Sequence, residues 1–432
     1  MILINSEPKL QLSSQVRRQL PSRGLVLFYS CLFALNVGGF QVISFLPEYL
    51  DLPNRLITVV YRAIIAMLCA VAFVIGLTKY RNVRPTLGLG CLGLFWLFYL
   101  YRLFLDTTWS PVPLELPVEE YFAYTFGVSL MTLLAFLFVK DERCYRWAMP
   151  LCLLLGVITC VGSLYYNLSD PTADLSRMMG NLILTSIPLG HAGVTIAVLG
   201  SFYLFNFSGK RQNIIVYGGC LISVLLGVTI VFMAASRGPL VALVVLFIII
   251  VWMGWRRRAR IQLSLLAIGL VAALPEIVRR VIEVGTRLDV YFGSTEAFIG
   301  SESTLNRYDL MKNAWQQFLE HTILGSSLLE RTWLTYPHNT VVESFMATGL
   351  MGGIPFCVVV VAGLIKAFRL FLKRPQSSWI PLLFLQAFIG SSFSGCLYYD
   401  PFFWGTLGAL LGIELPIASG GSLEATSLHC EH

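Results

Sequence analysis

The chain has 432 residues, of which 56% are hydrophobic and only 13% are charged. A soluble domain carries about 25% charged residues, so this composition excludes an ordinary soluble protein and indicates that most of the surface meets lipid. The net charge of +7 would suit nucleic acid, but the basic residues occur in short runs between apolar stretches, as topology signals do. The sequence therefore predicts an all-α, polytopic integral membrane protein that is surrounded by membrane lipids and binds no nucleic acid.

A helix needs about 20 mostly apolar residues to cross a bilayer. The chain offers twelve such stretches, at 24–46, 56–77, 87–105, 121–139, 148–166, 188–207, 214–235, 239–254, 261–275, 339–365, 379–397 and 401–415. These spans divide the chain into a tail 1–23, spans one to nine in 24–275, a large loop 276–338, spans ten to twelve in 339–415, and a tail 416–432. Two of the spans are short, which leaves a count between ten and twelve open.

Charge alternates along the loops between these spans. Loops rich in Lys and Arg alternate with short acidic loops, such as those that hold Asp51 and Glu119. Because cytoplasmic loops are enriched in Lys and Arg, the basic loops and both tails are predicted to be cytoplasmic. The acidic loops and the large loop 276–338 then lie on the other side of the membrane.

The large loop is too polar to span a bilayer and too long to be an idle connection. Its apolar residues recur at helical spacing, namely Tyr308, Met311, Trp315, Phe318 and Leu319. This pattern predicts an amphipathic helix that begins near Ser303 or Thr304 and ends before Gly325, and that lies on the membrane surface or against the bundle.

Three positions on this outer side carry groups that bind anions. Arg237 lies in a tight Gly- and Pro-containing turn, where it either extends to lipid headgroups or holds a phosphate. Arg307 lies in the first turn of the loop helix, where a cation is disfavoured unless an anion binds there too. His338 precedes a long span, beside free backbone N–H groups and with Asn339 as a helix cap. A solvated arginine and a loop histidine without a role are the plainer alternatives.

Two arginines, a histidine and a helix N-terminus on one face suit a diphosphate, because a departing diphosphate needs its developing negative charge stabilised. Motifs typical of nucleotide hydrolases, zinc proteases and serine esterases do not occur in the sequence. The ten cysteines form no CxxC pair. We therefore expect no metal site, no cofactor and no disulfide.

Three motifs follow one another around the large loop. The first is Ser236-Arg237-Gly238 at a span boundary, the second is Arg307 with residues 311–315 and 321–325, and the third is His338-Asn339 with Glu343 and residues 348–352. In order and spacing they resemble the O-antigen ligase and O-antigen polymerase superfamily, over about residues 185–365. Thr322 stands where the family usually has proline.

The resemblance implies a metal-independent, inverting membrane glycosyltransferase of the bacterial inner membrane, active at the periplasmic face. Its donor would be a glycan on undecaprenyl diphosphate. By motif position, Arg237 and Arg307 would bind the donor diphosphate, and His338, with Asn339 beside it, would bind the diphosphate or help to activate the acceptor hydroxyl. The acceptor would be a lipid A–core sugar for a ligase or a growing repeat-unit chain for a polymerase, and the sequence does not separate the two.

The group that removes the acceptor proton is left open among four acidic residues, namely Asp106, Glu302, Glu343 and Asp400. Arg102, an intramembrane charge in the third span, either pairs with Asp106 four residues on or binds the donor. A transporter or flippase for lipid-linked glycans is the alternative function. Transporters place charges near mid-membrane, often in repeated halves, whereas here the candidates gather at one face and no internal repeat is found.

Overall fold

The computed structural model describes residues 21–50, 53–79, 86–109, 112–169, 178–206, 214–256 and 302–414. Within these ranges the chain forms helices, turns and loops, and no strand. The predicted span 261–275 and the part of the large loop before residue 302 lie outside the described residues.

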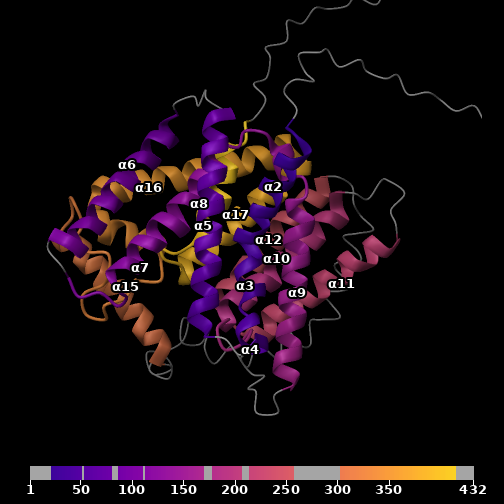
Figure 1. The fold of residues 1–432 in the computed structure, drawn as a ribbon, viewed down its shortest axis with the longest axis horizontal. Coiled ribbons are helices and arrows are strands. Elements are labelled where there is room, and N and C mark those ends of the chain that lie inside the picture. The colour runs from indigo at the N-terminus through magenta and orange to yellow at the C-terminus, as the bar shows by residue number, and fades with distance from the viewer. Residues whose placement is uncertain are drawn as a thin grey trace, which may run out of the picture.

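Helices account for most of the described chain (Figure 1). Those of the first part are α2 (Arg23–Ala34), η1 (Leu35–Gly39), α3 (Phe40–Ile43), α4 (Leu46–Leu50), α5 (Asn54–Lys79), α6 (Leu87–Phe104), η2 (Leu105–Trp109), α7 (Val118–Phe122), η3 (Ala123–Leu130), α8 (Met131–Leu137), η4 (Glu142–Tyr145) and α9 (Ala148–Ser169). Those of the second part are α10 (Ser186–Asn206), α11 (Ile214–Ala234), α12 (Arg237–Arg256), α15 (Glu302–Glu320), α16 (Thr340–Lys373), η6 (Pro375–Ser377), α17 (Trp379–Ser394) and α18 (Pro401–Gly412).

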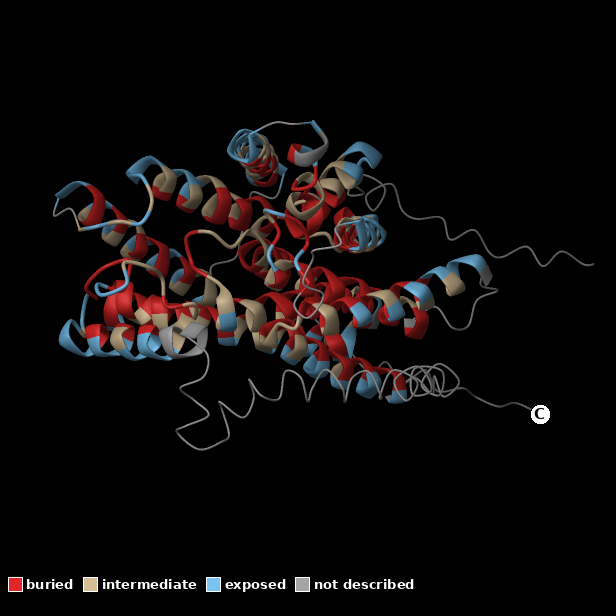
Figure 2. Cartoon of the chain, turned by 90° about the horizontal axis from the view of Figure 1, so that it is seen from below, coloured by how far each residue is buried: buried red, intermediate tan, exposed pale blue. Residues whose placement is uncertain are grey.

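Nine helical segments of the described chain are long and apolar enough to cross a bilayer, and the shorter apolar helices α17 and α18 follow them. Every predicted span except 261–275 overlaps one of these helices, while the count of twelve stays a prediction. Large apolar side chains are exposed on the outer faces, for example Met67 of α5 at 61% (Figure 2). Such a surface fits lipid better than water.

Helix α10 lies at the centre of one half of the bundle, where it packs against α9, α11, α12 and α17. In the other half α6 runs along α16, and α15 packs on α16 as well. Figure 1 shows these two halves on opposite sides, with α5, α8 and α17 between them. The last described helix, α18, packs against α8 and α17 and so connects the middle of the bundle to α5 and α10.

Ion pairs connect loops at both ends of the bundle. At one end, which we call the basic face, Lys140 pairs with Glu414 at 2.9 Å and Arg374 pairs with Glu142 at 2.9 Å. At the other end, which we call the acidic face, Arg55 pairs with Glu120. The acidic face also carries the loops 321–339 and 395–400. Each of these contacts joins segments that the charge pattern assigns to the same side of the membrane.

The predicted helix of the large loop is present as α15. It begins at Glu302, so Ser303 and Thr304 lie inside the helix, and Arg307 lies in its second turn, not in its first as predicted. It buries Leu310, Ala314 and Phe318 against the bundle, while Trp315 stays 44% exposed. The rings of Trp315 and Phe318 lie 6.2 Å and 5.3 Å from the ring of Phe345 in α16. The helix therefore packs on the bundle with one face and presents an apolar second face outward.

Helix α16 is interrupted at Gly349, whose φ of 60° is left-handed. The break admits the loop that follows α15: Leu350 N–H donates to the Thr322 carbonyl at 2.8 Å, and Ser326 N–H donates to the Met346 carbonyl at 2.9 Å. A Cβ on Gly349 would collide with the loop backbone, so this position requires glycine. The break thereby fixes the path of the loop toward His338.

Candidate functional site

Arg237 is the first residue of α12, on the acidic face. Helix α11 ends at Ala234, and only Ala235 and Ser236 connect the two helices. Ala235 has a φ of 45°, an uncommon value for a residue with a side chain, and such backbone strain often accompanies functional sites. The tight turn predicted from the sequence is thus present, and it holds Arg237 at a helix start.

His338 lies directly before α16, also with a left-handed φ, of 56°. Its ring packs edge to face on Tyr336, with 4.5 Å between the ring centroids. A ring N–H is directed to the Ser394 carbonyl. The other nitrogen, Nδ1, is buried and has no hydrogen-bond partner among the described residues. Asn339 caps α16, and its amide donates to the Ser392 carbonyl at 2.9 Å.

The end of α17 on the acidic face is where these elements meet. A Cβ placed on Gly238, next to Arg237, would lie 3.2 Å from the Cβ of Phe393. Asn339 and His338 contact the residues on either side of Phe393. Arg307 lies close enough to His338 for its charge to act on the imidazole. The turn at Arg237, the start of α16 and Arg307 are therefore grouped around one helix end, which we call the α17 terminus.

Burial and the nearby Arg307 charge lower the pKa of His338 to about 4. The imidazole is therefore neutral at pH 7. Since one ring N–H is directed to Ser394, Nδ1 remains as a hydrogen-bond acceptor. A neutral imidazole of this kind is suited to orienting a hydroxyl group.

Arg102 has a different role from a ligand-binding arginine. An arginine has five N–H donors, and all of those of Arg102 find protein acceptors. They are the carbonyls of Leu324, Gly325, Ser326 and Ala347, at 2.9–3.0 Å, and the Asp106 carboxylate at 3.4 Å. Asp106 in turn accepts from the Leu328 N–H at 2.7 Å. Of the two alternatives predicted for Arg102, these contacts favour pairing with Asp106. Together Arg102 and Asp106 hold the loop that follows α15 against α6.

The remaining candidates for the group that removes the acceptor proton differ in their surroundings. Glu343 is fully buried in α16, where it accepts hydrogen bonds from the Tyr99 hydroxyl at 3.2 Å and the Leu397 N–H at 2.9 Å. The side chain of Glu302 lies outside the described part of the chain. Of the three predicted residues whose side chains are described, Asp400 alone is among those that line the cavity described next.

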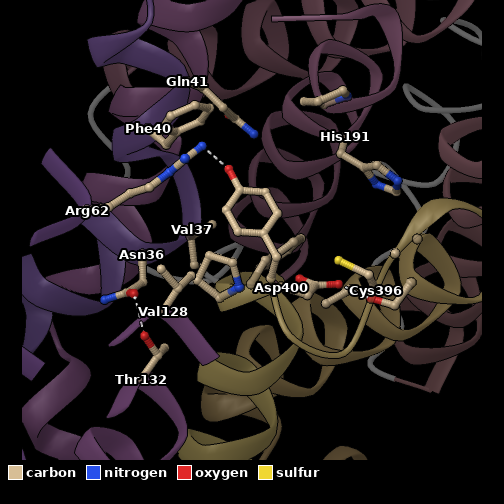
Figure 3. A pocket seen from close by; sticks show the side chains of 18 of the residues that line it. Asn36, Val37, Phe40, Gln41, Arg62, Val128, Thr132, His191, Cys396 and Asp400 are labelled. Atoms are coloured by element: carbon tan, nitrogen blue, oxygen red, sulfur yellow. Dashed lines mark hydrogen bonds between the residues drawn. The ribbon is translucent and has the colours of Figure 1, made fainter. Parts of the chain in front are cut away.

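A cavity of about 440 Å³ lies beside the α17 terminus (Figure 3). Its walls come from η1, α3, α5, η3, α8, α10 and α17, from the loop that leads into α18 and from the first turn of α18. Two of its walls are π-helical segments, which are frequent at functional sites. The polar residues that line it are Asn36, Gln41, Arg62, Thr132, His191, Ser391, Ser394 and Asp400. Tyr336 and Ser394 both line the cavity and contact His338, so the cavity borders the α17 terminus.

Asp400 presents a restrained carboxylate at this cavity. One oxygen accepts from the Phe403 N–H at 2.9 Å and caps α18, and the other accepts from the Ser391 hydroxyl. Burial raises the pKa of Asp400 to about 6. The group is therefore ionised at pH 7 and close to its titration range, as a general base requires.

Sequence reasoning missed two residues of the cavity, Arg62 and His191. Arg62 lies in α5 on the buried stripe formed by Thr58, Ile65 and Cys69. A charge on the buried face of an apolar helix is the same signal that identified Arg102 in α6. His191 faces the cavity from α10, on the opposite side from Arg62 (Figure 3).

Apolar helices with exposed outer faces and a polar site at one end of the bundle define a helical multi-pass membrane protein. Residues 221–357 match the model of a protein family described as O-antigen ligase. The matched segment contains Arg237, Arg307 and His338, and it confirms the resemblance to the O-antigen ligase and polymerase superfamily. Members of this family are transferases, so the match indicates glycan transfer. No curated protein matches the chain.

Proposed function

We propose that the protein is a metal-independent, inverting glycosyltransferase that moves a glycan from undecaprenyl diphosphate to an acceptor sugar. The acidic face is then the periplasmic face of a bacterial inner membrane. The observation that carries this proposal is the grouping of Arg237, Arg307 and His338 around the α17 terminus, within the segment that matches the O-antigen ligase family.

The donor diphosphate binds between the two guanidinium groups. Arg237 and Arg307 form charge-assisted hydrogen bonds to its oxygens, and the N-terminus of α16 adds a partial positive charge. As the bond from the anomeric carbon to the diphosphate oxygen breaks, these groups stabilise the charge that accumulates on the leaving diphosphate. The acceptor hydroxyl attacks from the opposite side, which inverts the configuration of the anomeric carbon.

Asp400 takes the proton of the acceptor hydroxyl. It is ionised at pH 7 and lines the cavity, whereas Glu343 and Asp106 are buried and do not line it. Neutral His338 orients the acceptor hydroxyl through its free Nδ1, or it binds the diphosphate by redirecting its single ring N–H from the Ser394 carbonyl.

Replacing Arg237 by lysine tests the proposal. Lysine keeps the charge but cannot form the bidentate contact of a guanidinium with phosphate. We expect R237K to lower the transfer rate about 100-fold in a purified nanodisc assay, the usual effect of losing one donor that stabilises a transition state. The matched control is R55K, an exposed arginine on the same face, which should keep the wild-type rate. Wild-type transfer by R237K would contradict the role of Arg237.

A further inference from the structure

Arg62 is an intramembrane cation that the proposed mechanism does not use. It lies two helical turns from the start of α5, about 12 Å along the helix axis from Asn54. Figure 3 shows its guanidinium extending into the cavity, toward Gln41 and the centre of the space. Charged residues at this depth are rare and usually mark functional sites.

The protein partners of Arg62 are all neutral. Its guanidinium donates to the hydroxyl of Tyr124 at 3.0 Å and to the hydroxyl of Tyr399. The guanidinium carbon lies 4.8, 5.2 and 4.6 Å from the ring centroids of Phe40, Tyr124 and Tyr399. In the described ranges, no aspartate or glutamate forms an ion pair with it.

Arg102 provides an internal comparison. Its five donors are all bound to protein acceptors and its charge is paired with Asp106, as a structural arginine requires. Arg62 uses two donors for tyrosine hydroxyls, and its other donors have no acceptor among the described residues. Leaving a guanidinium without a counter-charge is costly at this depth, so its surroundings fit a site that an anion occupies during function.

Asp400 lines the same cavity and does not neutralise Arg62. Its two oxygens are taken by the Phe403 N–H and the Ser391 hydroxyl. Tyr399, the residue before Asp400, is one of the two tyrosines whose hydroxyls accept hydrogen bonds from Arg62. The cavity thus offers a guanidinium from α5 that has no counter-charge and a separate carboxylate from the loop before α18, which suits a ligand that carries both an oxyanion and a hydroxyl group.

We propose that Arg62 binds a phosphate group of the glycan acceptor, in a subsite distinct from the donor site at Arg237 and Arg307. This inference rests on the proposed function. The guanidinium matches the geometry of phosphate oxygens, and the cavity of about 440 Å³ is within the range of small-molecule sites, about 300–1,000 Å³. The acceptor hydroxyl then lies near Asp400, at the side of the cavity that borders His338. The phosphate belongs to a phosphorylated core sugar or to the carrier diphosphate of an acceptor repeat unit.

Steady-state kinetics with R62Q test this subsite. In nanodiscs, R62Q should raise the KM for a phosphorylated acceptor at least about tenfold, the loss of one charge-assisted contact, and leave the KM for the donor unchanged. R62K, which keeps the charge, should recover part of the loss. The matched control is R55Q, two turns away in the same helix, where the side chain is exposed and paired with Glu120. R55Q should leave both KM values unchanged.

Two acceptors separate the sources of the phosphate. A phosphorylated lipid A–core is compared before and after phosphatase treatment, and a repeat unit is compared on its carrier diphosphate and as the free oligosaccharide. The acceptor whose KM depends on both its phosphate and Arg62 identifies the source. The subsite is overturned if neither acceptor responds to R62Q, or if R62Q raises the KM for the donor instead.

Hydrolysis of the donor by water, without acceptor, distinguishes this inference from the proposed function. R62Q should hydrolyse the donor at the wild-type rate, whereas R237K should not. Wild-type hydrolysis by R237K would contradict the donor site. The acceptor KM values of R62Q would then still test the Arg62 subsite.

If R62Q does not accumulate in the membrane, Y399F removes one hydroxyl that orients the Arg62 guanidinium. Y399F should then raise the KM for the acceptor alone, and an unchanged KM would overturn the subsite.

Discussion

His338 and Asp400 illustrate how burial sets chemistry at the scale of single residues. Burial lowers the pKa of His338 to about 4 and raises the pKa of Asp400 to about 6. In both groups the uncharged form is favoured because a low-dielectric environment penalises charge. Near neutral pH the imidazole is uncharged and the carboxylate is ionised, so the carboxylate is the better candidate for the base.

The pH dependence of transfer should therefore follow Asp400. The ionised carboxylate is lost as the pH falls through about 6, so the transfer rate should fall there, while His338 stays neutral down to about pH 5. A pH–rate profile between about pH 5 and 8 measures this. D400N should be slow and flat over the same range. An inflection near pH 6 that persists in D400N would assign the base to another group.

Arg62 and Arg102 show why sequence alone could not complete the site. Both are single arginines in apolar spans and carry the same signal. The carbonyls that satisfy Arg102 lie more than two hundred residues away in the chain, at residues 324–326 and 347. Only the structure shows that protein acceptors bind all five N–H donors of Arg102, whereas only two donors of Arg62 are bound by acceptors among the described residues.

At the scale of elements, the helices on both sides of the site were predictable because their signals are local. Apolar runs predicted α12 and α16, helical spacing predicted α15, and Gly and Pro predicted the turn at Arg237. The break in α16 was not predictable in this way, because it depends on a loop that enters the helix from outside. The π-helical segments η1 and η3 likewise reflect packing around the cavity and have no local signature.

Gly349 should be sensitive to the smallest substitution. G349A places a side chain at a φ of 60° and against the loop backbone, so we expect a loss of about 1–3 kcal/mol of stability or more. Thermal unfolding in detergent measures the change. The matched control is G90A in α6, where a Cβ meets no atom within 4 Å and alanine should not destabilise the helix. Equal melting temperatures for G349A and the wild type would contradict the anchoring of the loop.

At the scale of the whole molecule, two faces with different charge organise the fold. Basic loops meet at one end, through Arg374 and Lys140, and the candidate site lies at the other end. The division into faces was predictable because loop charge is a local property. The cavity was not, because its walls come from residues as distant as Asn36 and Phe402.

Cryo-EM of the protein in nanodiscs with a non-transferable undecaprenyl diphosphate glycan tests the central claim most directly. We expect the diphosphate at the α17 terminus on the acidic face, within hydrogen-bond distance of Arg237, Arg307 and His338. A diphosphate bound on the basic face, or held by none of these three residues, would contradict the account.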